Sequence, residues 1–193
     1  LHTTSQVRRD IPLTTGWNWI SFNLALDDPA LNPVLATLEH PANDLIKGQT
    51  SFAEYFNGNW LGSLTTANNT SMFQYRADVP DTIRMTGALI DPASVNIPVS
   101  AGWNWIGYVP NYALPVSDAL SNLNPLNGDI IKGQTAFAQY LAGFGWLGSL
   151  QFLEAPKGYQ LKIGNPGTLT YPPQGNFREN DLTSRGDDLD QTG

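Results

Sequence analysis

The residues best suited to bind a ligand occur in two copies in this chain. Residues 46–55 read IKGQTSFAEY and residues 131–140 read IKGQTAFAQY, so each copy has a lysine, a glycine and a glutamine in the same order. Glycine allows a ligand to approach the backbone closely, and the lysine and glutamine side chains supply hydrogen-bond donors. The same residues also suit a plain turn, in which glycine takes a positive φ and glutamine bonds to nearby backbone. The pattern therefore predicts either a binding loop or a plain turn in each copy.

All six tryptophans of the chain lie in two further repeated segments. The sequence GWNWI occupies residues 16–20 and again 102–106, while WLGSL occupies residues 60–64 and 146–150. The intervening residues differ freely, so the chain is an internal duplication whose copies kept tryptophan, lysine, glutamine and glycine. A hydrophobic core needs apolar volume but does not need lysine or glutamine. Their retention favours a surface with a function common to both copies.

Each tryptophan either fills the core or forms part of a binding surface. A buried indole contributes a large apolar area and needs a partner for its N–H group. An exposed indole can stack on the apolar face of a sugar ring. We predict that Trp17 and Trp103 belong to the core. We predict that Trp60 and Trp146, which lie beside glycine-rich hairpin turns, are exposed platforms for a sugar.

The two copies together predict one carbohydrate-binding site in each half of the chain, without a metal or a cofactor. A sugar would stack on tryptophan, while lysine, glutamine and asparagine side chains form hydrogen bonds with its hydroxyl groups. The candidate ligand-binding residues are Trp19, Asn18, Lys47, Gln49, Tyr55 and Trp60 in the first copy and Trp105, Asn104, Lys132, Gln134, Tyr140 and Trp146 in the second.

The sequence contains no repeated catalytic pair. Glu54 corresponds to Gln139 in the other copy, which breaks the pair of carboxylates that glycosidases use. Asp44 and Asp129 do correspond, but an aspartate before a strand is usually a turn residue. The histidines have no counterparts in the other copy, and no serine or cysteine nucleophile motif occurs. We predict that the protein is not an enzyme, and rank a glycoside-active enzyme with a single, unrepeated site as the third hypothesis.

The composition limits the partners and the compartment. A net charge of −7 argues against nucleic acid or an anionic membrane as the ligand. The chain has no cysteine, which excludes disulfides and thiolate metal sites, and it has no apolar run long enough to insert into a membrane. Only 14% of the residues are charged, and a surface rich in Asn, Thr, Ser and Gly is typical of extracellular modules. We predict a monomer that is secreted or held at the cell surface.

The elements that must position these side chains are predicted to be mainly β-strands. Strand geometry places Trp17 and Trp19 on one face of a strand and Asn18 and Ile20 on the other. Apolar residues at helical spacing predict one short helix in each copy. These residues are Leu31, Val34, Leu35 and Leu38 in the first copy and Val116, Leu120 and Leu123 in the second. We predict two homologous β-rich units that pack with pseudo-twofold symmetry.

The predicted units occupy most of the chain. The division is a lead-in or linker at residues 1–10, a first unit at 11–91, a connector at 92–96, a second unit at 97–173 and an acidic tail or linker at 174–193. The aspartates at residues 187–190 lack the glycine and the distal glutamate of an EF-hand loop. The tail is therefore predicted to be a solvated run of charge.

The repeated segments resemble the tandem GWNWIS repeats of multimodular secreted bacterial proteins. The matching ranges are 16–21, 46–55 and 60–64 in the first copy and 102–106, 131–140, 145–150 and 156–162 in the second. The second copy departs from the pattern at Gly107, where the first has Ser21, and the first copy lacks the Gly-Tyr pair near residues 72–76. The resemblance implies an accessory module beside catalytic or adhesive domains of the same parent chain, with a carbohydrate-binding role and no catalytic residues.

Two functions follow from these observations. The first is a non-catalytic module that binds a polysaccharide or oligosaccharide through tryptophan stacking and polar side chains. The alternative is a structural or adhesive cell-surface module that binds no glycan.

Overall fold

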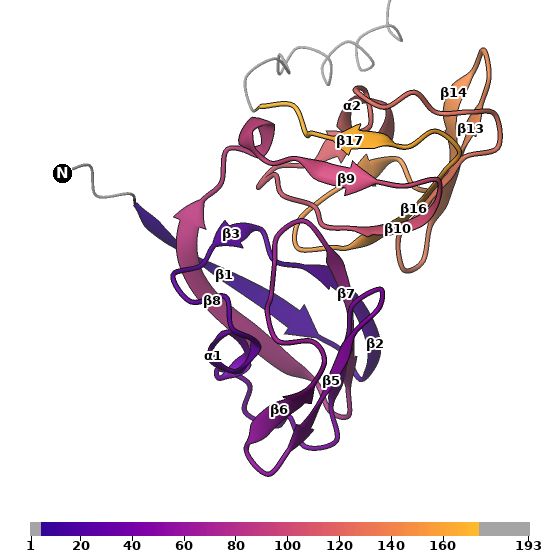
Figure 1. The fold of residues 1–193 in the computed structure, drawn as a ribbon. Coiled ribbons are helices and arrows are strands. Elements are labelled where there is room, and N and C mark those ends of the chain that lie inside the picture. Colours follow the sequence, from indigo (N-terminus) through magenta and orange to yellow (C-terminus); the bar gives the residue numbers. More distant parts are fainter. Residues whose placement is uncertain (1–4, 174–193) are drawn as a thin grey trace, which may run out of the picture.

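The computed structural model describes residues 5–173, and Figure 1 shows these as two groups of strands, one from each half of the sequence. The predicted mainly β fold class is confirmed, because antiparallel sheets account for most of the elements and the helices are short. The predicted tail at residues 174–193 lies outside the described residues. No helix among residues 5–173 is long and apolar enough to cross a membrane.

The first half contains eight strands and one short helix. They are β1 (Gln6–Leu13), β2 (Gly16–Ser21), β3 (Leu24–Ala25), α1 (Leu31–Leu35), β4 (Leu45–Lys47), β5 (Phe52–Phe56), β6 (Asn59–Gly62), β7 (Met72–Ala77) and β8 (Asp81–Leu89). A 3-10 turn, η1 (Pro92–Ser94), connects this half to the second.

The second half repeats much of this order. Its elements are β9 (Ile97–Val99), β10 (Gly102–Ile106), β11 (Leu114–Pro115), α2 (Val116–Ala119), β12 (Ile130–Lys132), β13 (Phe137–Leu141), β14 (Gly145–Gly148), β15 (Phe152–Leu153), β16 (Tyr159–Ile163) and β17 (Gly167–Leu169).

Each half is built on a five-stranded antiparallel sheet. The strand order is β2, β7, β4, β5, β6 in the first half and β10, β16, β12, β13, β14 in the second. The repeated segments fall on equivalent strands, because GWNWI forms β2 and β10 while WLGS lies in or just after β6 and β14. The two sheets therefore have the same strand order, and the pseudo-twofold packing of the halves stays a prediction.

Each half also has its own hydrophobic core, to which the inner face of its five-stranded sheet, the short helix and the strands outside that sheet contribute, among them β1 and β8 in the first half and β9 and β17 in the second. The predicted helix residues Leu31, Val34 and Leu35 are buried in the first core, and Val116 and its neighbours are buried in the second. Both helices are only about one turn long, so their stability depends on this packing rather than on helix propensity. The predicted burial of these residues is confirmed, but α1 ends at Leu35 and α2 at Ala119, so Leu38, Leu120 and Leu123 are buried just beyond the helices.

The lead-in ends earlier than the sequence predicted. Residues 6–10 belong to β1, which pairs with β8 from Gln6 opposite Ala88 to Leu13 opposite Asp81. The inward positions of this strand include Arg9, which is half-buried, so the alternation of apolar and polar residues is interrupted. The prediction of a linker at residues 6–10 was wrong because backbone pairing with β8 holds this segment and Val7 packs against the first core.

The two halves meet along the free edges of β2 and β10. The Ser21 N–H donates to the Pro156 carbonyl at 2.7 Å, and the Trp19 carbonyl accepts from the Gly158 N–H at 3.2 Å. At β10, the Gly107 N–H donates to the Thr70 carbonyl at 3.0 Å. An exposed edge strand is a template for aggregation, and here each half covers the edge of the other.

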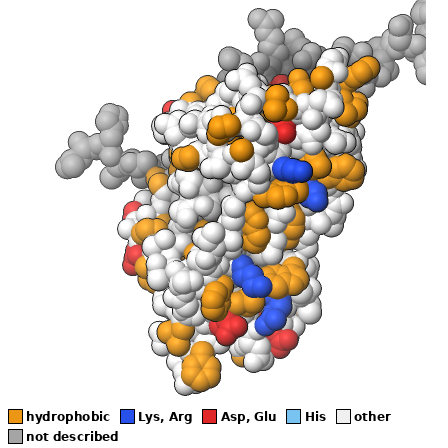
Figure 2. All heavy atoms as spheres, turned by 45° about the vertical axis from the view of Figure 1, so that its right-hand side comes forward, with side chains coloured by type: hydrophobic (Ala, Val, Ile, Leu, Met, Phe, Trp, Pro, Cys, Tyr) orange, Lys and Arg blue, Asp and Glu red, His pale blue; other side chains and the backbone are white. Residues whose placement is uncertain are grey.

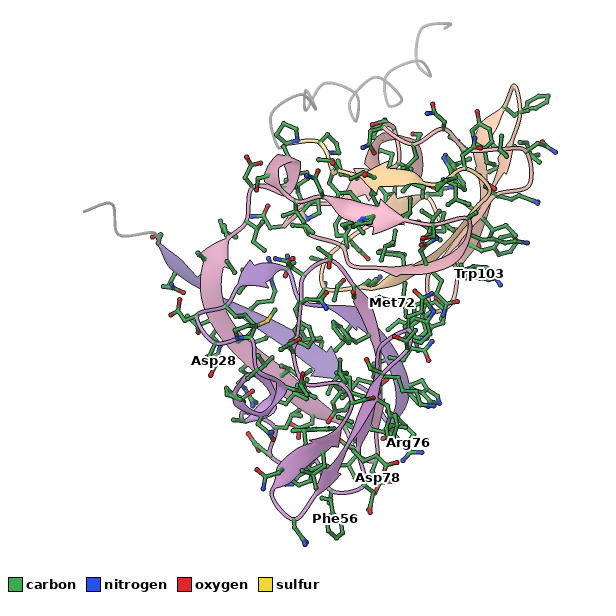
Figure 3. The ribbon with its side chains drawn as sticks, viewed as in Figure 1. Asp28, Phe56, Met72, Arg76, Asp78 and Trp103 are labelled. Carbon is green, nitrogen blue, oxygen red and sulfur yellow. The ribbon has the colours of Figure 1, made fainter. Side chains whose placement is uncertain are left out.

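This junction requires glycine at position 158. A Cβ atom there would lie 2.5 Å from the Cβ of Met72 and 2.6 Å from the Ile20 carbonyl oxygen. Met72 lies at the junction between the halves in Figure 3. The two backbones therefore approach closely at Gly158, and this contact fixes the position of one sheet relative to the other.

Candidate functional site

The outer face of the first sheet carries an exposed tryptophan between two cations. Trp17 on β2 lies directly opposite Arg76 on β7, because β2 and β7 pair in antiparallel register. Lys47, on the next strand β4, places its Nζ atom 5.1 Å from the centre of the Trp17 ring. A cation over an exposed indole is stabilised by about 0.5 to 1 kcal/mol through the ring quadrupole.

The second sheet repeats this arrangement. Trp103 on β10 lies opposite Lys162 on β16, and the Nζ atom of Lys132 lies 4.9 Å from the centre of the Trp103 ring. Equivalent strands thus place a tryptophan, a lysine over its ring and a second cation beside it in both halves. The repeated sequence predicted Lys47 and Lys132 as site residues. Arg76 and Lys162 were missed because the 156–162 segment has no matching segment in the first copy, so the equivalence of these two cations shows only in the strand pairing.

Exposed apolar side chains extend each of these faces. Phe52 and Leu61 follow in the first sheet, on β5 and β6, and Phe137 and Leu147 follow in the second, on β13 and β14. We name the two surfaces by these residues. Outer face 1 consists of Trp17, Lys47, Phe52, Leu61 and Arg76, and outer face 2 consists of Trp103, Lys132, Phe137, Leu147 and Lys162.

Both outer faces lie on the same side of the molecule. Figure 2 shows two groups of basic side chains on this side, each set among hydrophobic side chains. Trp103 and Arg76 project from this same side in Figure 3. A single extended ligand that lies along this side can therefore contact both faces.

The prediction that Trp17 and Trp103 are core residues was wrong. Trp17 is 38% exposed and Trp103 is 41% exposed, because alternation along β2 and β10 turns their neighbours inward instead. Ile20 and Ile106 take the inward positions and are almost fully buried. The core is filled by these aliphatic side chains, which leaves the indoles outside.

The prediction that Trp60 and Trp146 are exposed platforms was also wrong. Trp60 is only 6% exposed, and its ring packs against those of Tyr55 at 5.5 Å and Tyr75 at 5.7 Å. Trp146 is half-buried against the second core and packs on Tyr140 at 5.5 Å. Strand pairing places Tyr55 opposite Trp60 and Tyr140 opposite Trp146 on the inner sides of the sheets. All four predicted site residues therefore support the cores.

The two predicted asparagines hold turns. Asn18 Oδ1 accepts from the Thr14 N–H at 2.9 Å, and its Nδ2 donates to the Thr14 carbonyl at 2.8 Å. Asn104 makes the same pair of bonds with Ser100, at 2.9 and 2.8 Å. Their amide groups fix the turns before β2 and β10, so the predicted role as ligand contacts was wrong.

The two glutamines join the halves to each other. Gln49 Nε2 donates to the Trp103 carbonyl at 2.9 Å, and its Oε1 accepts from the Trp105 N–H at 2.8 Å. Gln134 makes the reciprocal pair, from Nε2 to the Trp17 carbonyl at 2.7 Å and from the Trp19 N–H to Oε1 at 2.8 Å. Each side-chain amide thus takes the place of a peptide group on a neighbouring strand. The sequence predicted a ligand contact or a local turn bond, and neither prediction included this contact across the halves.

The reciprocal bonds predict a stability effect. We expect Gln134→Glu to lower the free energy of unfolding by about 1 to 3 kcal/mol, because a carboxylate cannot donate to the Trp17 carbonyl. Gln74→Glu is the control, because Gln74 forms no side-chain hydrogen bond among residues 5–173. Urea denaturation of the two variants and the parent checks this result. An equal loss in both variants would show that added charge, rather than the lost bond, is responsible.

Trp19 and Trp105 line grooves at the junction of the halves. Trp19 lies in a cavity of about 280 Å³ with Thr135, Phe152 and Lys157. Trp105 lies in a cavity of about 230 Å³ with Ser71. Both tryptophans are half-buried, so they are less accessible than the exposed indoles of Trp17 and Trp103, with which they share one side of β2 and β10.

The repeated carboxylates are structural. Asp44 accepts hydrogen bonds from the Tyr75 hydroxyl and from the Asp78 N–H, and Asp129 accepts from the Leu126 and Gly164 N–H groups. Burial raises the pKa of the Asp44 carboxyl, while the hydrogen bond from Tyr75 opposes this rise. Asp44 is 1% exposed and Asp129 is 6% exposed, so neither reaches the outer faces.

The described residues hold no cluster suited to a metal ion. Residues 5–173 contain no group of three or more His, Cys, Asp or Glu side chains close enough to share one. The cations of the outer faces form no ion pair within residues 5–173. The three ion pairs of this part of the chain involve Arg8, Arg84 and Lys157 instead. The side chains of the outer faces can stack on a ligand, donate hydrogen bonds and attract anions.

Searches of protein-family models, of curated proteins and of solved structures found no match to this chain. The similarity to GWNWIS repeats consequently rests on the sequence motifs alone.

Proposed function

We propose that the protein is a non-catalytic module that binds a polysaccharide through outer faces 1 and 2. The observation that carries the proposal is an exposed indole with a lysine over its ring at the same position in both sheets. The C–H groups of a pyranose ring form a flat apolar surface that fits an indole. Lysine and arginine donate strong hydrogen bonds to the oxygen atoms at the edge of such a ring.

The free protein exposes apolar side chains to water at these positions, which is unfavourable and indicates an interaction surface. On the first sheet, Trp17 and Phe52 are 38% and 49% exposed, and Lys47 links them because it lies opposite Phe52 and places its ammonium group over the Trp17 ring. Contiguous apolar side chains rimmed by polar groups mark binding sites on soluble proteins. Burying these side chains against a ligand would recover about 25 cal/mol for each Å² of apolar area removed from water.

Two equivalent faces suit a polymer better than a small sugar. Because both faces lie on one side of the molecule, a single chain can contact both. A second contact on the same chain raises retention through effective concentration. Each face can therefore bind weakly while the whole module binds firmly.

The absence of a carboxylate pair common to both outer faces supports a binding role rather than hydrolysis. Glu54 faces outward on β5, but Gln139 occupies the equivalent position on β13. Retaining glycosidases hold two carboxyl groups about 5 to 5.5 Å apart, and inverting enzymes hold them farther apart. The proposal includes secretion or display at the cell surface as a monomer, beside other modules of a parent chain, on the basis of composition and motifs.

A structural or adhesive cell-surface module is the second candidate. The observation that favours it is a strongly exposed aromatic residue at the end of a hairpin in each half. Phe56 is 63% exposed and Phe144 is 79% exposed. Neither has a cation over its ring in the described residues, so these side chains suit an apolar protein surface better than a sugar.

The test compares the parent protein with the double variant Trp17→Ala/Trp103→Ala in affinity electrophoresis through gels containing a panel of polysaccharides. We expect at least one polymer to retard the parent, and the double variant to lose this retardation, because central tryptophans dominate such interfaces. The molar mass of the polymer should stay unchanged during the experiment.

Phe144→Ala is the matched control, because it removes an exposed aromatic side chain outside the cation-bearing pair. Equal retardation of the parent and the double variant would contradict the proposal, as would retardation that only Phe144→Ala abolishes. Release of reducing ends above that of a heat-inactivated sample would contradict the non-catalytic role.

A further inference from the structure

Both outer faces present basic side chains on a protein that is strongly acidic overall. The chain has 10 basic and 17 acidic residues, yet each outer face presents two cations. Lys47 and Arg76 belong to outer face 1, and Lys132 and Lys162 belong to outer face 2. Basic residues gathered against the net charge of a protein indicate that the ligand is itself an anion.

Acidic residues accompany the cations on the first face only. Glu54 points outward on β5. Asp78 comes just after the end of β7, two residues beyond Arg76, and Figure 3 shows the two residues close together. The equivalent positions in the second half are Gln139 and Gly164, because Ala77 and Ile163 occupy the same register positions. When Glu54 and Asp78 are counted with outer face 1, two anions balance its two cations, whereas the two cations of outer face 2 stand alone with a charge of +2.

We propose that the ligand is a polyuronate and that outer face 2 is its stronger site, with Glu54 as the residue that weakens outer face 1. This inference rests on the proposed polysaccharide-binding function and names the chemical class of the ligand. Its ligand is a chain of sugars with one carboxylate on each ring.

The geometry favours a carboxylate attached directly to the stacked sugar. When a pyranose ring lies on Trp103, the carboxylate stands at the edge of the ring, where the ammonium groups of Lys132 and Lys162 can reach it. The Lys132 stem is flexible, and its ammonium group forms no ion pair within residues 5–173, so it can move from the indole to the ligand. Two cations on a face match one carboxylate per sugar, while a heavily sulfated chain would require a denser array of cations.

Glu54 acts on this ligand through charge rather than through shape. Strand pairing places it opposite Leu45 and Leu61, among the outward side chains of the first sheet. A carboxylate on a bound sugar near Lys47 is therefore repelled by Glu54. This repulsion is screened by salt, because the Debye length falls from about 30 Å at 0.01 M to about 8 Å at 0.15 M ionic strength.

The experiment isolates each face and changes one charge. In a Trp103→Ala background, which leaves outer face 1, Glu54→Gln should tighten binding of a hexamer of galacturonic acid by about 3- to 10-fold at low salt. In a Trp17→Ala background, which leaves outer face 2, Gln139→Glu should weaken it by a similar factor. Both effects should shrink at 0.15 M salt, and outer face 2 should bind the hexamer more tightly than outer face 1.

The matched ligand is the fully methyl-esterified hexamer, which has the same shape without the charge. Neither substitution should change the affinity for it. Asp28→Asn is the matched protein control, because it makes the same change in net charge on an exposed loop away from the outer faces, as Figure 3 shows. An effect of Asp28→Asn equal to that of Glu54→Gln would overturn the assignment of Glu54.

Other ligands separate failure of this inference from failure of the proposed function. Tryptophan-dependent binding of the methyl ester, with equal or better affinity than the acid, would leave the polysaccharide role standing and overturn the polyuronate. Tighter binding of a heavily sulfated glycan or of single-stranded DNA than of the uronate hexamer would likewise overturn it. If no glycan in the polysaccharide panel binds, the proposed function itself fails, and this inference fails with it.

Discussion

Replacing Trp60 by alanine is expected to lower the free energy of unfolding by about 3 to 5 kcal/mol. The indole is 6% exposed and packs edge-on against Tyr55 and Tyr75, so truncation removes apolar contacts and leaves a cavity in the first core. Its backbone N–H also donates to Asn32 Oδ1 at 2.7 Å, which ties β6 to the helix α1. The stability loss is thus expected to reach the helix as well as the sheet.

Trp17→Ala is the matched control for this prediction. It removes the same side chain from a position that is 38% exposed, where the ring contacts Lys47 rather than the core. Surface substitutions of this kind change stability by about 0.5 to 1 kcal/mol. Urea denaturation followed by circular dichroism compares the two variants. A loss in Trp17→Ala as large as that in Trp60→Ala would place Trp17 in the core after all.

Removing one outer face is expected to reduce retention on a long polysaccharide by about 10²- to 10⁴-fold. In the intact protein, two weak contacts on one chain reinforce each other because the second is intramolecular. The reciprocal bonds of Gln49 and Gln134 hold the faces in a fixed relation, so little conformational freedom is lost when both engage. Either Trp17→Ala or Trp103→Ala should therefore abolish most of this gain.

Short and long ligands distinguish this effect from simple loss of affinity. With an oligosaccharide that spans one face, calorimetry should give half the parent stoichiometry for each single variant and no binding for the double variant. Retention on the polymer should fall sharply in both single variants. Full stoichiometry in both would show that the indoles are bystanders, and the structural or adhesive role would then be preferred.

Repetition in the sequence predicted much of the architecture correctly. The equal strand orders of the two five-stranded sheets follow from repeated segments, because similar sequences form similar local structure and pair in the same register. The short helices were predicted from the spacing of Leu31, Leu35 and their equivalents, because helical periodicity alone selects the buried stripe. These features depend on residues that are close together in the chain, and the identities and spacing of such residues can be read from the sequence.

Alternation along β2 separated the residues correctly but did not show which side faces the core. Trp17 and Trp19 share one side, and Asn18 and Ile20 share the other, as the sequence predicted. The hydrophobicity of tryptophan favoured the wrong side. Only the docking of β2 on the first core turns Ile20 inward, and Asn18 joins it there because the preceding turn satisfies its amide.

The roles of the repeated glutamines and lysines show where sequence reasoning ends. From sequence alone, Lys47 and Gln49 are two polar residues beside the same glycine, equally suited to a ligand. In the structure Lys47 faces outward over an indole, whereas Gln49 bonds to β10, more than fifty residues away in the chain. The sequence by itself determined that the chain is a duplicated β protein with helices buried on one side. The tertiary structure alone decided which tryptophans meet solvent and which polar side chains join the halves, because those outcomes depend on contacts between segments distant in sequence.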